Sequence, residues 1–267
     1  MTELSAIARP TGTFAMVAMD QRESLRTMLR ERGREPEYDA FKTAVARVLS
    51  PHASGFLIDA DHLEAVEPYV GRGLILAVDV LDQERGAIVE DTTLDEDPRL
   101  RPSVAALKLL VIWRDDERRA ERVEMARRFV ELARSHDLLS VLEPVVREDA
   151  QIVQAARELG AVRPSLYKCQ VPTAGVASSA EITLRCREID AALPVPWVVL
   201  SQGVAYEEFP RAVQAACAGG ASGFLAGRAL WTNALDADDV DAALRAQSVP
   251  RLQELCEIVD RHGRPAC

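Results

Sequence analysis

A lysine stands at the centre of a short apolar segment, residues 165–171, which reads SLYKCQV. Alternate residues of an extended chain share a face, so Lys168 would point to the same side as Leu166 and Gln170. The composition and flanks of the segment predict a short buried strand. A buried ammonium is costly unless it is paired, and loss of water favours the neutral, nucleophilic amine. Lys168 is therefore a candidate for chemistry, and simple pairing with a carboxylate inside the fold is the alternative.

Three other ionisable residues, Asp20, Lys108 and Glu143, stand in or directly after comparable apolar segments. A neutral amine can attack a ketone to form an imine, and the protonated imine draws electrons from the adjacent carbon–carbon bond. A second ammonium, from Lys108, would help to keep the amine of Lys168 uncharged near neutral pH. Glu143 would transfer protons as general acid and base. Together these residues predict aldol chemistry through a lysine Schiff base.

Eight apolar segments of strand length recur along the chain, and amphipathic helix-like stretches such as 115–136 and 206–220 lie between most of them. This alternation in 267 residues matches a closed (β/α)₈ TIM barrel of the α/β class, formed by a single domain over residues 1–267. A doubly wound open sheet is the alternative, but no GxGxxG motif follows the first segment. The predicted strands are 14–20, 54–60, 73–80, 106–113, 138–146, 165–171, 196–204 and 222–230.

An anion site is predicted beside the four ionisable residues. Barrels often bind phosphate with the loops after strands seven and eight, and these loops begin SQGV and AGRALW here. Ser201, Gly203 and Gly227 would offer backbone N–H groups or a hydroxyl, and the glycines would permit close approach. Arg228 would add a charged fork.

The other polar features are assigned structural roles. Asp59 and Asp79 end the second and third strands and are expected to cap the segments that follow. Region 82–105 is charged and contains two prolines, which predicts a long loop after the third strand. The four histidines have no HxH or HExxH spacing, so the sequence gives a metal-dependent mechanism little support.

The overall composition excludes several classes of protein. A net charge of −10 without a clustered basic face argues against a nucleic-acid partner. The apolar segments are too short to span a membrane. Five dispersed cysteines without CxxC spacing, and an N-terminus without a secretory pattern, predict a cytoplasmic protein with reduced thiols.

Several segments resemble the Schiff-base aldolases of the tagatose-1,6-bisphosphate aldolase type, and the likeness covers nearly the whole chain. They are FAMVAMDQRESLRTML, ALKLLVIWR, VLEPVVR, LYKCQVP, PWVVLSQGV and GASGFLAGRALW. The segments DQRES, KLLVIWR, LSQGV, FPRAV, AGRALW and SVPRLQELCEIVD resemble the sulfofructosephosphate aldolase branch more closely. The resemblance implies a (β/α)₈ barrel without metal or cofactor that cleaves a ketose 1-phosphate to dihydroxyacetone phosphate and a three-carbon aldehyde.

The resemblance also assigns roles to residues. It makes Lys168 the imine-forming lysine, Glu143 the proton-transfer group, Lys108 the auxiliary lysine and Asp20 the residue that orients a substrate hydroxyl. The residues implied to bind substrate are Gln21, Arg22, Ser201, Gln202, Gly203, Gly227 and Arg228. Two features depart from the family: Gln170 stands where a glutamate is usual, and the segment around 147–151 is shorter than the expected loop.

The leading functional hypothesis is cleavage of 6-deoxy-6-sulfofructose 1-phosphate to dihydroxyacetone phosphate and sulfolactaldehyde. The nearest alternative is the same chemistry on tagatose or fructose 1,6-bisphosphate, which gives glyceraldehyde 3-phosphate. A sugar-phosphate sensor and an isomerase are the remaining alternatives. Related aldolases suggest a homo-oligomer, and apolar residues of the last helix are expected to cover either the barrel or a neighbouring subunit. These are Leu252, Leu255, Ile258 and Val259.

Overall fold

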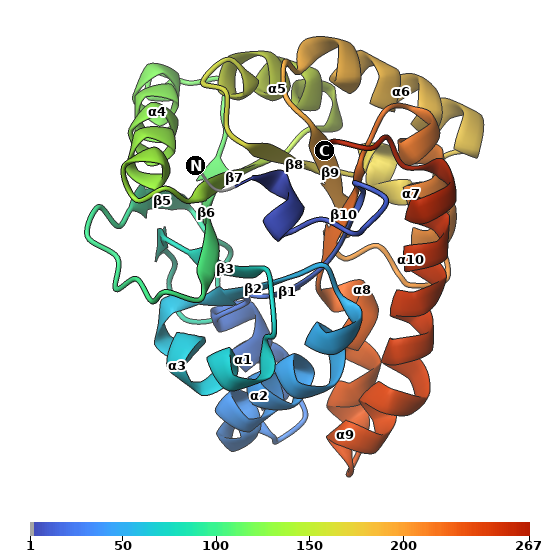
Figure 1. Ribbon diagram of the computed structural model, residues 1–267. Helices are drawn as coiled ribbons and strands as arrows, with labels where there is room; N and C mark the ends of the chain where they lie inside the picture. The colour runs from blue at the N-terminus through green and yellow to red at the C-terminus, as the bar shows by residue number, and fades with distance from the viewer. Residues whose placement is uncertain (1–2) are drawn as a thin grey trace.

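The computed structural model describes residues 3–267, so residues 1 and 2 of the predicted domain lie outside the described part. Eight parallel strands close into a barrel in the order β1–β2–β3–β6–β7–β8–β9–β10 (Figure 1). Each strand overlaps one of the eight predicted segments, which confirms the (β/α)₈ barrel. The strands are β1 (Phe14–Met19), β2 (Gly55–Asp59), β3 (Leu74–Ala77), β6 (Val104–Ile112), β7 (Leu139–Val145), β8 (Leu166–Gln170), β9 (Trp197–Leu200) and β10 (Gly223–Ala226).

Helices surround the barrel because each has one apolar face that packs on the outer side of the strands. The helix predicted over 115–136 is α4 (Arg119–Ser135), and the one predicted over 206–220 is α7 (Phe209–Ala218). The other helices are α1 (Glu23–Arg30), α2 (Tyr38–Leu49), α3 (Leu63–Val66), α5 (Ile152–Gly160), α6 (Ser179–Ala192), α8 (Arg228–Trp231), α9 (Val240–Ala243) and α10 (Val249–His262). No helix among residues 3–267 is both long and apolar enough to cross a membrane.

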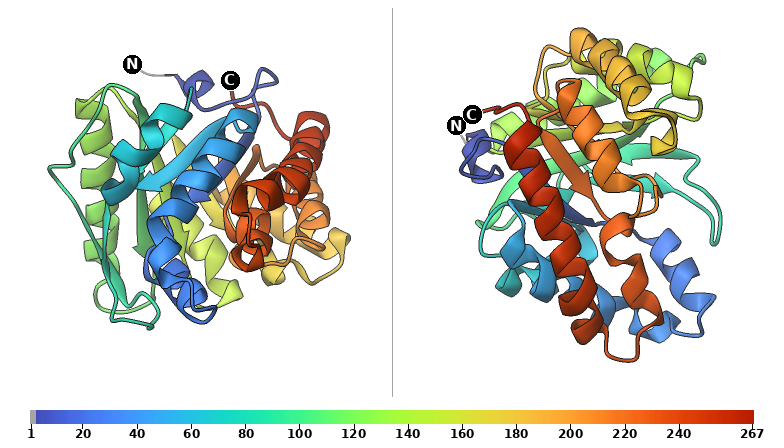
Figure 2. Two further views of the ribbon diagram at one scale, coloured as in Figure 1. Left: turned by 90° about the horizontal axis from the view of Figure 1, so that it is seen from below. Right: turned by 90° about the vertical axis from the view of Figure 1, so that its right-hand side faces the viewer.

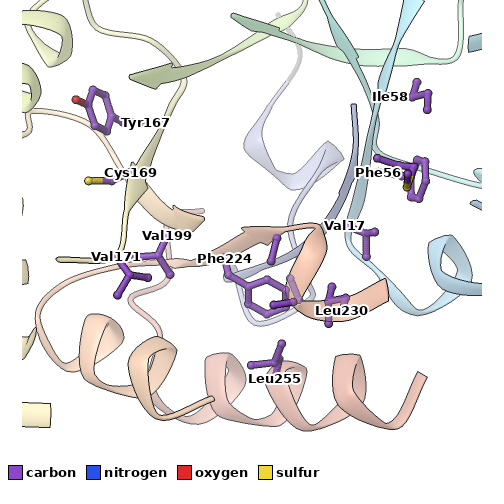
Figure 3. Close-up of a cluster of buried hydrophobic side chains, with 14 of the residues drawn as sticks. Val17, Phe56, Ile58, Tyr167, Cys169, Val171, Val199, Phe224, Leu230 and Leu255 are labelled. Atoms are coloured by element: carbon purple, nitrogen blue, oxygen red, sulfur yellow. The ribbon is translucent and has the colours of Figure 1, made fainter. Parts of the chain in front are cut away.

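Side chains alternate between the inside and the outside of the barrel along every strand. On β8, Tyr167 and Cys169 point outward into the core between strands and helices, where Phe224 of β10 and Leu255 of α10 also lie (Figure 3). Leu166, one residue away from Tyr167, belongs to the separate cluster inside the barrel. The same alternation turns Lys168 inward, as the strand pattern predicted.

The inside of the barrel is apolar at its N-terminal end. Phe14, Met16 and Leu166 are among the residues that fill it, and all three are fully buried. The chain before β1 closes this end: Ile7 and Ala8, which follow a short 3₁₀ helix at Leu4–Ala6, pack into the same cluster. Figure 1 shows this helix lying across the barrel. A ligand can therefore enter only at the C-terminal end of the strands.

A β-hairpin follows β3; its first strand begins within the predicted strand 73–80, and its second lies in region 82–105, where the sequence predicted a long loop. Strands β4 (Asp79–Asp82) and β5 (Asp91–Leu94) pair antiparallel. The hairpin extends from the opposite end of the barrel to the chain ends (Figure 2). One anchor is Thr92, whose buried hydroxyl donates to the Leu110 carbonyl of β6 over 2.8 Å. The loop prediction was wrong for β5, because its charged and hydroxyl residues hide the alternation that marks a strand.

Helix α10 packs on its own barrel. Leu252, Leu255 and Val259 are completely buried within the chain, and Ile258 is partly buried against the same core. Arg9 holds Asp260 of this helix through two hydrogen bonds of 2.8 and 2.7 Å. These apolar residues therefore cover the barrel, which resolves the alternative left open by the sequence.

Candidate active site

The four predicted ionisable groups meet inside the C-terminal end of the barrel. Glu143 lies between the two lysines: its Oε1 is 2.9 Å from Nζ of Lys168, and its Oε2 is 3.0 Å from Nζ of Lys108. Nζ of Lys108 also donates to Oδ2 of Asp20 over 2.8 Å. Lys108 is 1% exposed, Lys168 3% and Glu143 6%. The structure thus brings groups from β6, β7 and β8 and the end of β1 into one connected ion cluster.

Strand register explains how residues so far apart in sequence come together. Lys108 on β6 lies beside Val141 of β7, and Leu110, two residues further along β6, lies beside Glu143. All four side chains share the inward direction because the alternation along each strand has a period of two. The apolar residues deeper in the barrel exclude water, so each charge must find its partner among the others.

Asp79 is a member of the cluster that sequence reasoning missed. Its Oδ1 lies 3.0 Å from Nζ of Lys108 and accepts the backbone N–H of Leu110 over 3.1 Å. Its Oδ2 lies 3.3 Å from Arg22. The prediction that Asp79 is a cap was wrong because the pairing of β3 with β6 places it beside Lys108. The signal available was its position at a strand end, the same signal that identified Asp20.

The charges of Lys108 and Asp20 are fixed by their surroundings. Burial works against the ammonium of Lys108, but Asp20, Asp79 and Glu143 outweigh it and raise the pKa of Lys108 well above its ordinary value. Burial likewise disfavours the carboxylate of Asp20, and the charges of Lys108 and Lys168 outweigh it, so the pKa of Asp20 is lowered. Lys108 therefore stays cationic and Asp20 anionic through the physiological pH range.

The cluster lies in the wall of a cavity of about 720 Å³, a volume ordinary for a small-molecule site. Ser201, Gln202, Gly227 and Arg228, from the loops after β9 and β10, line one side of it. No carboxylate among the described residues lies within ion-pair distance of the partly buried guanidinium of Arg228; burial lowers its pKa without removing its charge.

Two glycines shape the backbone beside Arg228. Gly203 has a φ of +88°, in the left-handed region that glycine tolerates, and a side chain there would start 3.9 Å from the Arg228 guanidinium. Gly203 is not among the residues that line the cavity, although its chain neighbours Ser201 and Gln202 are. At Gly227 a Cβ would fall 2.7 Å from the carbonyl oxygen of Ala18 and 2.8 Å from Nε2 of Gln21. Only glycine allows this close approach.

Gln21 and Arg22 line the cavity next to Asp20. The Oε1 atom of Gln21 is buried and has no hydrogen-bond partner. A buried acceptor without a partner is costly in a folded protein, and a donor from a bound ligand would satisfy it. Arg22 is already engaged, because it donates to the Asp79 carbonyl over 2.7 Å in addition to its ion pair with that carboxylate.

Gln170, one of the two departures from the family pattern, fastens β8 to the loop after β7. Its Oε1 accepts from the Val146 N–H over 2.6 Å and its Nε2 donates to the Val146 carbonyl over 3.2 Å. An amide can make both contacts, whereas a carboxylate can only accept. The side chain is buried and is not part of the cavity wall, so its role here is to hold the loop.

A second buried ion cluster lies behind β2. Lys42 of α2 donates to Asp59, the last residue of β2, and Nδ1 of His62 lies 2.6 Å from the other oxygen of that carboxylate. Nε2 of His62 is 2.9 Å from Asp39. The prediction that Asp59 is a cap was therefore wrong, because its carboxylate pairs with these two side chains. Within residues 3–267, no group of three or more histidine, cysteine or acidic side chains is arranged to hold a metal ion.

A closed (β/α)₈ barrel with an ion cluster of lysines and carboxylates at its open end has the architecture of a TIM-barrel enzyme. A family model described as DeoC/LacD family aldolase matches residues 14–233, and the chain belongs to this family. It is a class I aldolase, and thus a lyase.

Individual relatives extend over the whole chain. The tagatose 1,6-diphosphate aldolase of Listeria monocytogenes serotype 4b (strain CLIP80459) is 24% identical over 316 aligned positions, which cover 98% of this chain and 92% of that protein. The enzyme of the same name from Listeria innocua serovar 6a has the same identity and coverage.

Solved structures share the fold. An archaeal fructose-1,6-bisphosphate aldolase, whose catalytic lysine is bound to the carbinolamine intermediate, superposes with a TM-score of 0.62 at 18% identity and covers 95% of this chain and 96% of its own. A fructose-bisphosphate aldolase from Plasmodium falciparum gives a TM-score of 0.73 at 13% identity, with 98% of this chain and 94% of its own chain covered.

Proposed function

We propose that this aldolase cleaves a ketose 1-phosphate to dihydroxyacetone phosphate and a three-carbon aldehyde through a Schiff base on Lys168. The observation that carries the proposal is the position of Glu143, whose two carboxylate oxygens face Lys168 and Lys108 in the wall of the cavity. A carboxylate in contact with the nucleophilic amine can move protons to and from every atom that reacts there.

The proposed reaction begins with attack of the uncharged Lys168 amine on the C2 carbonyl. The Glu143 carboxylate takes a proton from the attacking nitrogen and passes it to the carbinolamine oxygen; a second proton, from solvent and delivered through Glu143, lets the hydroxyl leave as water and yields the protonated imine. The Glu143 carboxylate then takes the proton of the C4 hydroxyl, the C3–C4 bond breaks, and its electrons pass to the iminium to form an enamine while the aldehyde departs. Protonation of the enamine at C3 and hydrolysis of the imine release dihydroxyacetone phosphate and restore the amine.

The other two members of the predicted set act through their fixed charges. Lys108, which stays cationic, would hold a fixed positive charge 3.0 Å from the Glu143 carboxylate. Asp20 would orient a substrate hydroxyl by accepting its hydrogen bond. Gln21, whose amide oxygen lacks a partner, would accept from another hydroxyl.

The 1-phosphate is assigned to the side of the cavity formed by Ser201, Gln202, Gly227 and Arg228, with Gly203 shaping the turn. An arginine without a carboxylate partner offers a forked donor to a phosphate. Gly227 is required at this turn because a Cβ there would collide with the Ala18 carbonyl oxygen and with Nε2 of Gln21.

For the distal end of the substrate we propose a sulfonate, so that the substrate is 6-deoxy-6-sulfofructose 1-phosphate and the aldehyde is sulfolactaldehyde. Two observations support this choice: the segments that resemble the sulfofructosephosphate aldolase branch, and the small number of available cations. Of the arginines that line the cavity, Arg22 is paired with Asp79 and Arg147 with Glu90, which leaves Arg228. A sulfonate is a monoanion, whereas a phosphate is largely a dianion near neutral pH.

The relatives named as tagatose 1,6-diphosphate aldolases favour a second candidate, tagatose or fructose 1,6-bisphosphate. Steady-state kinetics with purified enzyme distinguishes the two. We expect a higher kcat/KM for the sulfonate, and a clear preference for a bisphosphate would reverse the choice of substrate while leaving the chemistry intact.

Reductive trapping tests the chemistry itself. Incubation with substrate and borohydride should leave a reduced adduct on Lys168, which peptide mass spectrometry locates. The matched control is Lys108→Arg, which keeps the positive charge next to Glu143 and leaves Lys168 available for trapping. An enzyme that turns over its substrate without an adduct at Lys168 contradicts the proposed mechanism.

Two further proposals concern assembly and location: a homo-oligomer, from the sequence resemblance, and a cytoplasmic location, from the five dispersed cysteines without CxxC spacing. Sedimentation velocity of the purified protein tests the first, and a monomer across micromolar concentrations would refute it. Fractionation of the source cells, with the protein detected by antibody, tests the second.

A further inference from the structure

A carboxylate stands beside the cavity opposite Arg228. Glu90 immediately precedes β5 in the hairpin, and its Oε2 lies 3.2 Å from Arg147 and 3.2 Å from Arg114. Arg114 also donates to the backbone carbonyl of Glu90 over 2.6 Å. One carboxylate oxygen thus contacts two guanidinium groups, one of which, that of Arg147, lines the cavity.

The tip of the hairpin forms part of the cavity wall and is held mainly by polar contacts. Ala87, Ile88 and Val89 line the cavity, yet the Ile88 side chain is 66% exposed. On the side away from Glu90, the Gly86 N–H donates to a carboxylate oxygen of Glu23 in α1 over 2.8 Å. Arg85 and Glu35 add an ion pair of 3.6 Å. The Glu90 contacts therefore form one tether on the β6 and β7 side, next to the ion pair of Asp91 with Arg118.

Arg147 and Arg228 lie on different sides of the open end. Arg147 follows β7 and Arg228 follows β10, and these strands are three places apart in the closed order β10–β9–β8–β7. Lys168 is on β8, between them. A substrate with its phosphate at Arg228 and its carbonyl at Lys168 would extend its distal end toward Arg147. The Arg147 guanidinium already contacts the Glu90 carboxylate there.

We propose that Glu90 is a specificity-determining residue, whose carboxylate competes with the distal anionic group of the substrate for Arg147. The inference rests on the proposed function, because it needs a ketose 1-phosphate with an anion at its far end. Repulsion between Glu90 and that group grows with the charge of the group, so a dianion is disfavoured more than a monoanion. Glu90 thereby selects substrates with a singly charged distal end.

The test is the variant Glu90→Gln, which removes the charge and keeps the shape. We measure kcat and KM for 6-deoxy-6-sulfofructose 1-phosphate and for fructose 1,6-bisphosphate, in the parent enzyme and in the variant. One exposed charge pair contributes up to about 1 kcal/mol, so we expect the kcat/KM ratio of bisphosphate to sulfonate to rise about fivefold, through KM. The rise should shrink at high salt, because salt screens exposed charges.

Glu35→Gln is the matched control, because it weakens the tether on the other side of the hairpin without changing the charge beside Arg147. It should leave the ratio unchanged. In the background Arg147→Met, Glu90→Gln should raise the ratio less than it does in the parent, because competition for the shared guanidinium is gone and only the direct repulsion by Glu90 remains.

The other possible results distinguish a failure of the role proposed for Glu90 from a failure of the proposed function. An unchanged ratio in Glu90→Gln, or an equal rise in Glu35→Gln, overturns the role of Glu90 while the aldolase assignment stands. If the parent enzyme cleaves neither substrate, the proposed function fails, and the role of Glu90 fails with it.

Discussion

Two buried lysines of this protein have opposite environments. Lys108 lies among three carboxylates, those of Asp20, Asp79 and Glu143, which raise its pKa in spite of burial. Lys42 is completely buried too, but it has one carboxylate partner, Asp59, and burial dominates, so its pKa is lowered.

The two clusters also differ in access. Lys108 lines the cavity of about 720 Å³ and Lys42 does not, although both side chains are sealed from bulk water. Lys42 instead packs under the ring of Tyr38, 4.9 Å from its centroid. Burial and pairing by themselves therefore do not distinguish the cluster proposed to be catalytic from the one proposed to be structural. What separates them is an open volume beside the charges that a substrate can occupy.

The largest expected effect is the loss of turnover in Lys168→Ala. Removal of a covalent nucleophile should lower kcat on the order of 10⁴–10⁶-fold. The fold should persist, because Glu143 keeps its contact with Lys108. Steady-state kinetics together with circular dichroism checks both statements. Activity near that of the parent would remove Lys168 from the mechanism.

Lys108→Met should have the next largest effect. Loss of the fixed cation beside Glu143 should lower kcat about 10²–10³-fold, the range seen when one electrostatic stabiliser is removed from an active site. Steady-state kinetics of the variant measures the loss, and a kcat within tenfold of the parent value would exclude this role.

Lys42→Met is the counterpart in the structural cluster, and it should affect stability. It leaves the carboxylate of Asp59 buried without its lysine, a change that costs about 3–5 kcal/mol, with the lower end expected because His62 remains as a partner. Urea unfolding measures the loss, and kcat should stay within the order of magnitude of the parent. Unchanged stability, or a loss of kcat like that of Lys108→Met, would erase the distinction between the clusters.

The smallest effect is a pH dependence of stability from His62. Burial opposes its charge, but hydrogen bonds to Asp59 and Asp39 outweigh burial and raise the pKa of His62 above 6.5. The folded protein then binds the proton more tightly, so this stabilisation is complete below pH 6.5 and is lost as pH rises through the folded-state pKa. Melting temperatures should fall over that interval in the parent and stay flatter in His62→Gln. Parallel curves would contradict the assignment.

The barrel could be predicted because its signals are local. Each of the eight strands has a continuous apolar segment, and periodicity within a dozen residues distinguishes it from the helices around it. The hairpin could not be predicted in the same way. Its strands, β4 and β5, carry charged and hydroxyl side chains and owe their order to contacts such as that of Thr92 with Leu110.

The residues of the site also fall into those with a local sequence signal and those without one. Lys168, Lys108 and Glu143 could be found because a charge inside an apolar segment is conspicuous. Asp79 and Asp59 were misassigned as caps because their partners, Lys108 and Lys42, are distant in sequence and become neighbours only through strand pairing and helix packing. The tether from Glu90 to Arg147 joins two loops and has no local signature.

Apolar side chains fill the N-terminal end of the barrel, and the cavity lies at the C-terminal end of the strands. Phe14, Met16 and Ile7, which help to fill this end of the barrel, are apolar and fully buried. In the proposed reaction, a proton that reaches the enamine carbon C3 from solvent would therefore enter through the same opening as the sugar substrate. The loops at the C-terminal end of the strands would then control the access of both solvent protons and substrate to the site.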